Sequence, residues 1–241
     1  MLSRVSSFSG PISKFFKRPN DSAFITSNTI LYLDAGLTSS YPGTGTTWYD
    51  LSVQANHATS LYNVTYNSGS GGYLIFNGID SQGALNSSKY NVTYSGKTVF
   101  ISAYLEAHMG NNVFRGLLGA SSGNRNFNFY LNRDLSGNYS LHYSQGGVGG
   151  FSNFITITPG TWFTAGFTHT TAGVVTYYFN GVAVGGGNYT FFQYLAGSTD
   201  HIGRSDNYWY GRLGVVTIYK TALTSSEILQ NHNSIKNRFL L

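Results

Sequence analysis

The sequence contains no cysteine, and only four of its 241 residues are prolines. The absence of cysteine excludes a disulfide framework and any thiolate metal site. Charged residues make up 10% of the chain, against about a quarter in an average soluble protein. The surface must therefore consist mainly of hydroxyls, amides and tyrosine rings, and stability must come from burial and from hydrogen bonds within sheets.

Acidic residues are scarcer still, because the chain has nine of them and only two are glutamates. Glycoside hydrolysis normally requires a pair of carboxylates. Glu227 is explained by a helix cap, Glu106 stands alone at the end of a strand, and no Glu-x-Asp or Asp-x-Glu occurs. Asp200 and Asp206 are the nearest pair, but Gly203 between them indicates a turn or the start of a strand. We therefore expect that the protein is not an enzyme, and a glycoside hydrolase ranks last among the functions considered.

Long apolar runs and local metal or phosphate motifs are also missing. No stretch of about 18 apolar residues occurs, so the sequence predicts no transmembrane helix. The six histidines show no His-x-His or His-x-x-x-His spacing, which leaves a zinc site without local support. The glycine-rich segments 146–150 and 185–187 lack the following helix that would make them anion sites, and we interpret them as flexible loops.

The chain is rich in the residues that build sheets and turns, with 41% hydrophobic residues, 16% aromatic residues and 30 glycines. This composition supports one substantial core and is typical of an all-β protein. Alternation of apolar and polar residues predicts strands over 30–33, 73–76, 98–105, 113–119, 127–131, 139–143, 154–157, 162–169, 174–179 and 182–184. Asn180-Gly181, between the last two strands, predicts a tight hairpin.

The last fifth of the chain has the most informative order of features. The aromatic run Tyr208 to Tyr210 leads into an expected strand, Leu213 to Tyr219, and Thr224 to Glu227 has the form of a capping box. The helix predicted there has a partly apolar face made by Ile228, Leu229, Ile235 and Phe239. A closing strand followed by a capped terminal helix is a specific way to finish a β-sandwich, and it favours a binding module over an enzyme.

The first 27 residues differ from the rest and are predicted to form an N-terminal arm. Residues 1–20 hold four basic residues and no acid, a net charge of +4, whereas the other ten basic residues face nine acids, a net charge of +1. The arm lacks the continuous apolar stretch of a signal peptide. Two interpretations stay open: a disordered tail, or an arm that becomes ordered on a partner. The residues expected to dock are Arg4, Phe8, Lys14, Phe15, Phe16, Lys17 and Arg18.

Several short motifs occur along the chain in an order found in a known family. They are Tyr32-Leu33-Asp34-Ala35-Gly36, the segment Ser40 to Ser52 with Thr47-Trp48-Tyr49-Asp50, Phe76-Asn77-Gly78-Ile79-Asp80, Gly160-Thr161-Trp162-Phe163, Tyr178-Phe179-Asn180-Gly181, and the closing segment Ile218 to Ile228. In this order the chain resembles the concanavalin A-like lectin/glucanase superfamily, and within it the laminin G-like domains of phage and other virus virion proteins. The resemblance covers residues 28–241 and implies a jelly-roll β-sandwich of two antiparallel sheets.

The resemblance also shows departures that bear on metal binding and catalysis. Where family members often carry two acids before the closing strand, this chain has Gly214 and Val215. Calcium requires several oxygen ligands, usually including two or more carboxylates. We therefore expect no cofactor. Asp34, Asp50 and Asp80 are weak candidates for calcium ligands, and they are more simply explained as turn caps at strand ends.

Carbohydrate binding has better support, because exposed tyrosine and tryptophan rings can stack on sugar faces while polar groups satisfy sugar oxygens. Tyr208, Trp209 and Tyr210 cannot all point inward from one strand, so we expect at least one ring at the surface. With Arg204 and Asn207 they form the candidate site for a glycan or for a neighbouring subunit. The other two tryptophans are interpreted as core residues.

These observations lead to two main hypotheses of function. The first is a virion structural protein, a capsid decoration or cement protein whose arm docks on the major capsid protein or another virion protein. The alternative is a carbohydrate-binding adhesin or receptor-binding module on a virion or cell surface, with a cell-surface glycan as partner. By analogy with other capsid decoration proteins, we expect a homo-oligomer, namely a trimer. The nearly neutral domain argues against nucleic-acid binding, and Phe15 to Arg18 gives weak support to a membrane surface.

Overall fold

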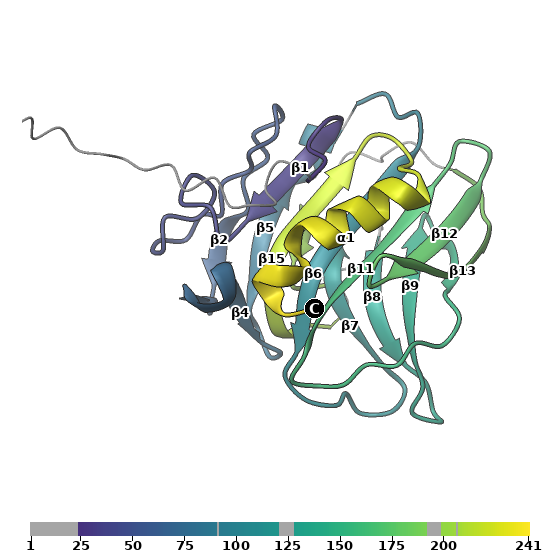
Figure 1. The fold of residues 1–241 in the computed structure, drawn as a ribbon. Coiled ribbons are helices and arrows are strands. Elements are labelled where there is room, and N and C mark those ends of the chain that lie inside the picture. Colours follow the sequence, from purple (N-terminus) through teal and green to yellow (C-terminus); the bar gives the residue numbers. More distant parts are fainter. Residues whose placement is uncertain (1–23, 91, 121–127, 192–198, 206) are drawn as a thin grey trace, which may run out of the picture.

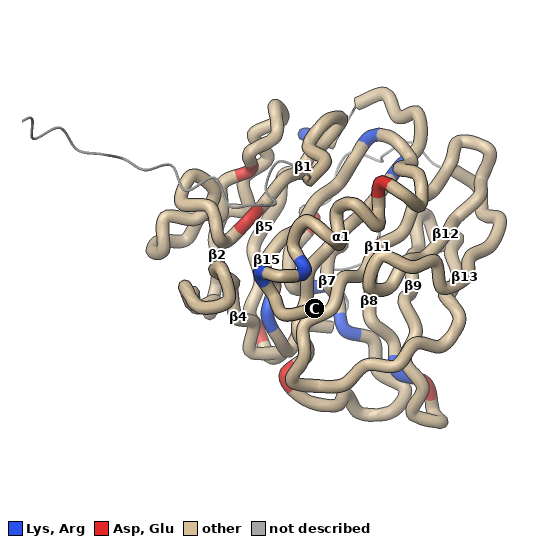
Figure 2. The backbone as a smooth tube through the Cα atoms, viewed as in Figure 1, with Lys and Arg blue, Asp and Glu red and all other residues tan. Residues whose placement is uncertain are grey.

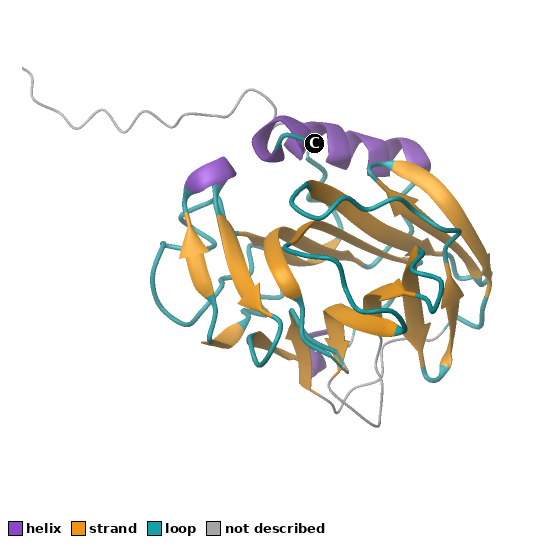
Figure 3. Ribbon diagram, turned by 90° about the horizontal axis from the view of Figure 1, so that it is seen from below, coloured by secondary structure: helices purple, strands orange, loops and turns teal. Residues whose placement is uncertain are grey.

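The computed structural model describes residues 24–90, 92–120, 128–191, 199–205 and 207–241. Within these residues the chain forms two antiparallel β-sheets packed face to face, with one α-helix on the outside of one sheet (Figure 1, Figure 3). The expected jelly-roll sandwich with a single terminal helix is therefore confirmed.

The eight-stranded sheet of the described chain carries the helix. Its order is β13-β12-β11-β6-β15-β4-β3, and β1 pairs with the second half of β15, beyond the residues that pair with β4. The strands are β1 (Thr29–Asp34), β3 (Thr65–Asn67), β4 (Tyr73–Asn77), β6 (Lys97–Leu105), β11 (Trp162–His169), β12 (Val174–Phe179), β13 (Val182–Asn188) and β15 (Tyr210–Tyr219).

The seven-stranded sheet forms the second layer, in the order β10-β9-β8-β7-β14-β5-β2 among the described residues. Its strands are β2 (Thr59–Tyr62), β5 (Gln82–Asn86), β7 (Val113–Ala120), β8 (Asn128–Arg133), β9 (Tyr139–Gln145), β10 (Val148–Phe151) and β14 (Thr199–Ile202). Two short 3-10 helices, η2 (Gly69–Gly71) and η3 (Ser87–Tyr90), lie in connections between strands.

The strands agree with the alternation of the sequence except in its glycine-rich and short segments. Strands β11 and β12 begin and end where predicted, but residues 154–157 form only an isolated bridge through Ile155. The glycine segments, expected as flexible loops, belong largely to β10 and β13. A Cβ on Gly149 or Gly186 would lie 2.0 Å from the carbonyl oxygen of Tyr143 or Val175. These glycines therefore permit close contact between neighbouring strands.

The core lies between the two sheets and is rich in aromatic rings. Trp48 and Trp209 have no exposed surface and belong to the same cluster of buried side chains. Trp162, also expected in the core, is half-buried on the outer side of the eight-stranded sheet, where its ring centroid lies 4.3 Å from that of Phe239. The sandwich thus has a main core and a smaller one under the helix.

Helix α1 (Ser225–Phe239) begins at the predicted capping box. The Thr224 hydroxyl accepts a hydrogen bond from the Glu227 N–H, and the Glu227 carboxylate accepts one from the Thr224 N–H at 2.7 Å. The helix buries Ile228, Ile235 and Phe239. No helix in the described part of the chain combines the length and the apolar character needed to cross a membrane.

Gly214 on β15 makes room for the end of this helix. A Cβ at this position would lie 2.2 Å from Cζ of Phe239, which is closer than real side-chain contacts allow. The position where the resemblance leads one to expect an acid therefore lies directly beneath a buried ring. Even a small side chain at position 214 would displace Phe239.

The chain is already packed on this sheet before β1 begins. The ring of Phe24 stacks on that of Tyr32 at 5.5 Å between centroids. The Ile25 N–H donates to Oδ1 of Asn231 on α1 at 2.8 Å, and the Ile25 carbonyl accepts a hydrogen bond from the Tyr219 hydroxyl at 2.7 Å. The packed body thus includes residue 24, whereas the arm was predicted to extend to residue 27.

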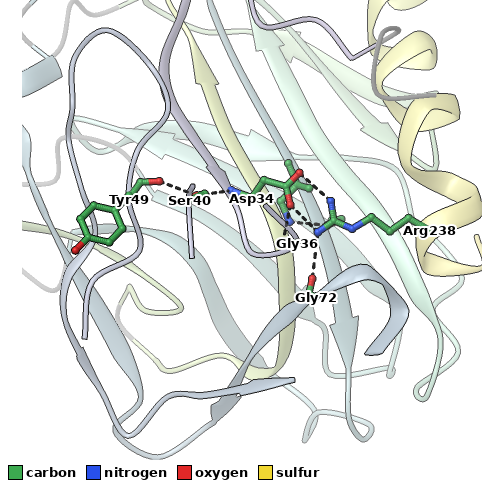
Figure 4. Close-up of polar contacts among 8 residues, drawn as sticks. Asp34, Gly36, Ser40, Tyr49, Gly72 and Arg238 are labelled. Carbon is green, nitrogen blue, oxygen red and sulfur yellow. Dashed lines mark hydrogen bonds and ion pairs between the residues drawn. The ribbon is translucent and has the colours of Figure 1, made fainter. Parts of the chain in front are cut away.

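A buried ion pair joins the end of α1 to the end of β1 (Figure 4). Nη2 of Arg238 lies 2.6 Å from Oδ1 of Asp34, and Nη1 donates to Oδ2 at 2.8 Å. The two side chains are only 9% and 7% exposed. Arg238 also donates to the carbonyl of Gly72, and the Asp34 carboxylate accepts from the Gly36 N–H. The pair therefore ties the first strand, the η2 loop and the last helix together.

We expect Arg238→Met to lower the free energy of unfolding by about 3 kcal/mol, because it leaves the buried Asp34 carboxylate without its counter-charge. Urea denaturation followed by tryptophan fluorescence measures the change. Lys236→Met removes a charge from the same helix and should cost less than about 1 kcal/mol. Equal losses in the two variants would contradict the role assigned to the ion pair.

Candidate functional site

The aromatic run predicted as a binding site enters β15 with its side chains alternating. Trp209 points into the core and has no exposed surface. Tyr210 is 41% exposed, and Tyr208 is half-buried. Trp209 is therefore a core residue that offers no ring to a ligand, while the tyrosines on either side of it reach the surface as strand alternation requires.

Arg115, Arg204, Tyr208 and Tyr210 gather at one end of the sandwich, and we call them the Tyr208 cluster. The guanidinium carbon of Arg204 lies 4.9 Å from the ring centroid of Tyr208. Nη1 of Arg115 donates to the carbonyls of Tyr208 and Gly78, at 2.9 Å each. Gly78 has a φ of 73°, and a Cβ there would lie 2.6 Å from Cβ of Tyr210. The sequence indicated three of these residues, and Arg115 is an addition from the structure.

Asn207, the remaining predicted site residue, lies exposed in the loop between β14 and β15. Its carbonyl accepts a hydrogen bond from the Gly116 N–H on β7 at 3.0 Å. A Cβ on Gly116 would lie 2.1 Å from the backbone nitrogen of Ser205, so the loop crosses β7 at a position that only glycine can occupy. This contact holds the Asn207 amide at the surface, in the same loop as Arg204 and Tyr208.

The three weak candidates for calcium ligands lie in separate hydrogen-bond networks. Asp34 is paired with Arg238, as described above. The Asp50 carboxylate is occupied by four donors, namely the N–H groups of Tyr32, Ser52 and Asn56 and the hydroxyl of Ser52. Asp80 accepts from the side-chain amides of Asn63 and Asn77. Over the residues that the structure describes, no group of three His, Cys, Asp or Glu side chains gathers as metal ligands.

Turn chemistry explains two of these three aspartates. Asp34 and Asp50 each accept a hydrogen bond from the N–H two residues further on, which is the geometry of an Asx turn. In the β4–β5 turn the same contact is made by Asn77, whose Oδ1 accepts from the Ile79 N–H. Asp80 instead stabilises the turn from its other side through the two amides.

Charged residues are sparse along the described backbone (Figure 2). Glu106 forms a bidentate contact with Arg212, with its shorter distance at 2.7 Å, and this hydrogen bonding raises the pKa of the Arg212 guanidinium. Glu227 is committed to the helix cap. The docking residues predicted in the arm, Arg4, Phe8, Lys14, Phe15, Phe16, Lys17 and Arg18, lie outside the described residues.

A second group of rings lies on the outer face of the seven-stranded sheet and was not indicated by the sequence. Tyr130, His142 and Phe151 are cross-strand neighbours on β8, β9 and β10, and Phe114 of β7 contacts all three rings. Phe129, next to Tyr130, points into the core, so alternation places Tyr130 on the opposite face. We call these four rings the aromatic cluster.

The rings of the aromatic cluster form a stack that ends in solvent. The His142 ring lies 4.3 Å from that of Phe151 with an interplanar angle of 18°, and 5.5 Å from that of Tyr130 at 12°. Tyr130 is buried, whereas Phe151 is 46% exposed. An apolar ring face of this size, supported from behind by a second ring, can pack against the C–H face of a ligand.

Buried polar atoms lie on the same face beside these rings. Asn128 and Ser144 are cross-strand neighbours, and His201 continues their row through Gly119. In the described part of the chain, the Asn128 amide, the Ser144 hydroxyl and Nδ1 of His201 have no hydrogen-bond partner. Burial lowers the pKa of His201 to about 4, with a smaller effect from the Arg204 charge. Buried polar atoms of this kind need a partner, which is water, a bound polar group or a group outside the described residues.

A hydrogen-bonded network of Lys97, Gln145 and Tyr143 is enclosed between the sheets. Nζ of Lys97 donates to Oε1 of Gln145 at 2.9 Å, and the Tyr143 hydroxyl donates to the same oxygen at 2.7 Å. Burial lowers the pKa of Lys97 to about 7, although the charge of Asp200 acts in the opposite direction. Because Lys97 has no exposed surface, this network belongs to the core.

The two facing antiparallel sheets, with rings exposed on an outer face, define a lectin-like β-sandwich. The chain belongs to the concanavalin A-like lectin/glucanases superfamily, whose family model matches residues 101–229. This match confirms the resemblance seen in the sequence at the level of the superfamily. No curated protein matches the chain.

Solved structures share the fold at low sequence identity. Domain 4 of AbnA, an extracellular GH43 arabinanase from Geobacillus stearothermophilus in complex with arabinotriose, has a TM-score of 0.61 and 20% identity, covering 85% of this chain and 98% of that domain. A structure of botulinum neurotoxin type C, whose cell entry is described as dependent on interaction with two ganglioside molecules, has a TM-score of 0.65 and 12% identity. The match covers 86% of this chain and 51% of the toxin chain. A Trypanosoma rangeli sialidase has a TM-score of 0.62 and 14% identity, and the match covers 88% of this chain and 33% of the sialidase.

These alignments show the fold alone, because all the identities are low. The chain spans nearly all of the arabinanase domain, about half of the toxin chain and a third of the sialidase. The sandwich therefore occurs both in a separate domain and as part of larger proteins, some of them enzymes. That this protein is not an enzyme stays a prediction.

The low pKa of Lys97 predicts a pH dependence of stability. Its folded pKa is about 7 against 10.5 for a free lysine, so the unfolded chain binds more protons between these values and stability should rise with pH there. We expect urea midpoints of the wild type to rise from pH 7 to 9.5, and those of Lys97→Met to rise less. The exposed Lys220→Met should follow the wild type, and parallel behaviour of all three proteins would contradict the prediction.

Proposed function

We propose that the protein binds carbohydrate on the outer face of the seven-stranded sheet, with Phe151 as the ring that contacts the sugar. The observation that carries this proposal is the stacked pair of Phe151 and His142, in which a flat, half-exposed ring lies at the surface of a charge-poor sheet. Sugar rings present C–H groups on one face and hydroxyls at their rim. Asn128 and Ser144, in the next row of the same sheet face, have polar atoms without a described partner, but they are buried, so the exposed Phe151 ring carries the proposed contact.

The comparisons support this proposal without extending to a particular sugar. The arabinanase domain that matches over almost its full length is described in complex with arabinotriose, and the neurotoxin is described as dependent on two gangliosides for cell entry. Both are carbohydrate ligands of other proteins that carry a similar sandwich. For this chain we infer the class of ligand, a glycan, from the rings on its own surface.

We expect a glycan array to identify at least one neutral glycan, and Phe151→Ala to weaken its binding about tenfold, because a lost stacking contact costs about 1.4 kcal/mol. Tyr49→Ala is the matched control, since Tyr49 is 43% exposed and lies outside the aromatic cluster. The control should bind as the wild type does. An array without any bound glycan, or equal losses in the two variants, would contradict the proposal.

As a second function we propose that the protein is a structural component of a virion, docked through its N-terminal arm, with the sandwich facing outward at the capsid surface. The charge of the chain favours this, because residues 1–20 carry +4 while the rest carries +1. The two functions are compatible, since a docked arm would leave the aromatic cluster facing a host glycan. The proposed partner is the major capsid protein or another virion protein, and the oligomer, a trimer by analogy, belongs to the same proposal.

Deletion of residues 1–23 tests the docking arm, and it retains Phe24 because that ring packs on the sheet. We expect the full chain to co-purify with virus particles from its source, and the deletion variant to fold but to stay unbound. Replacing Lys14, Lys17 and Arg18 by glutamine should weaken association and make it less sensitive to salt. Unchanged association of the deletion variant would exclude docking by the arm.

A further inference from the structure

The arginines of the described chain differ in how their charges are balanced. Arg212 and Arg238 each hold a carboxylate in a bidentate ion pair. Arg115 and Arg204 contact no carboxylate in the part of the chain that the structure describes, although both contact Tyr208. Two unbalanced guanidinium groups therefore lie around one tyrosine.

The neighbouring loops hold both guanidinium groups in place. Arg115 is fixed by the carbonyls of Gly78 and Tyr208, at 2.9 Å from the same nitrogen, Nη1. Arg204 is fixed through Nη1 by Oε1 of Gln82 at 2.8 Å and by the ring of Tyr208. Among the described residues only neutral groups make these contacts, so no carboxylate there neutralises either charge, and the buried Nε of each arginine has no hydrogen-bond partner in the same part of the chain. Preorganised donors of this kind lose little entropy when they bind an anion.

The electrostatics of this end favour a negative ligand. Arg115 is half-buried, and burial lowers the pKa of its guanidinium, so its charge is held there at a cost. Asp80 in the adjacent turn accepts from the amides of Asn63 and Asn77 and makes no ion pair with either arginine, so its single negative charge offsets the two positive charges only in part. An anion placed between the two arginines would gain attraction from both and would relieve their mutual repulsion.

We propose that Arg115 and Arg204 bind the carboxylate of an acidic sugar, whose ring lies against Tyr208 and Tyr210. A carboxylate matches the planar fork of a guanidinium group, which favours it over a sulfate ester. Tyr210 is 41% exposed and Asn207 beside it is exposed, which supplies a ring face and an amide for the rest of the sugar. The proposal extends the proposed carbohydrate binding by a second subsite of different chemistry.

The test compares glucuronate with glucose, because the two differ only in a carboxylate and a hydroxymethyl group. Both are titrated into the full chain at low salt, about 50 mM, and binding is followed by NMR of backbone amides. We expect glucuronate to bind at least about tenfold more tightly than glucose, as charge-assisted hydrogen bonds predict. The perturbed amides should lie near residues 204–210.

Arg204→Gln is the informative variant, because Arg115 also holds two loops together and its loss could unfold this end. We expect this variant to bind glucuronate about tenfold more weakly, with unchanged thermal stability. Lys220→Gln removes an exposed charge elsewhere and should bind as the wild type does. Equal binding of glucuronate and glucose, or full affinity of Arg204→Gln for glucuronate, would overturn the proposal.

Two further titrations separate related sources of the same signal. Acetate that binds as tightly as glucuronate would show a plain anion site and would overturn the assignment to a sugar, and tighter binding of glucose 6-sulfate would overturn the choice of a carboxylate. Tyr49→Ala, outside both groups of rings, should leave glucuronate binding unchanged. Binding of glucuronate that depends on Arg204, together with no neutral glycan bound at Phe151, would support this subsite while contradicting the site proposed on the sheet.

Discussion

The ion pair between Asp34 and Arg238 is the contact on which the helix-covered side of the sandwich depends. It fixes the last turn of α1 against the end of β1, and it places Phe239 over Gly214 on β15. Strand β15 pairs with β6 along one edge and with β4 and β1 along the other, so it lies in the interior of the sheet. The helix packs on this interior strand. In a chain with so few acids, one buried pair holds the first and last elements together.

Glycines allow loops and the helix to approach the sheets closely, and two of them shape the Tyr208 cluster. Gly116 lets the β14–β15 loop cross β7, which brings Arg204 and Tyr208 to Arg115. Gly78 adopts a positive φ and leaves room for Tyr210. Gly214 leaves room for Phe239 of the helix on the other side. The high glycine content, which suggests flexible loops when read along the sequence, here reflects close backbone contacts.

The sequence predicts the longer elements well, and the short strands and the surfaces less well, for a physical reason. Alternation located β11 and β12, and the capping box located α1, because both signals are local. The aromatic cluster depends on register, since Tyr130, His142 and Phe151 meet only once three strands are paired. The contact between Arg115 and Tyr208 likewise depends on the fold, because the two residues are 93 positions apart in the sequence. The burial of Trp209 was also not predictable from alternation, because alternation shows that neighbouring side chains face opposite sides but does not say which side is the core.

The described carboxylates are held in contacts within the protein, so the proposed binding rests on the other polar and aromatic groups of these surfaces. Of the described carboxylates, Asp34 and Glu106 are held by arginines, Asp50, Asp80 and Asp134 by N–H or amide groups, and Glu227 by the helix cap. The remaining one, Asp200, has no exposed surface and acts on the charge of the buried Lys97. Glycoside hydrolysis needs two carboxyl groups that face the substrate, one as the acid and the other as the nucleophile or base. The groups left for a ligand are instead ring faces, amides and guanidinium groups. In the proposed function, ring faces pack on the C–H groups of a sugar, amides bond its hydroxyls, and guanidinium groups bind its carboxylate, so each kind of group recognises a different part of the same ligand.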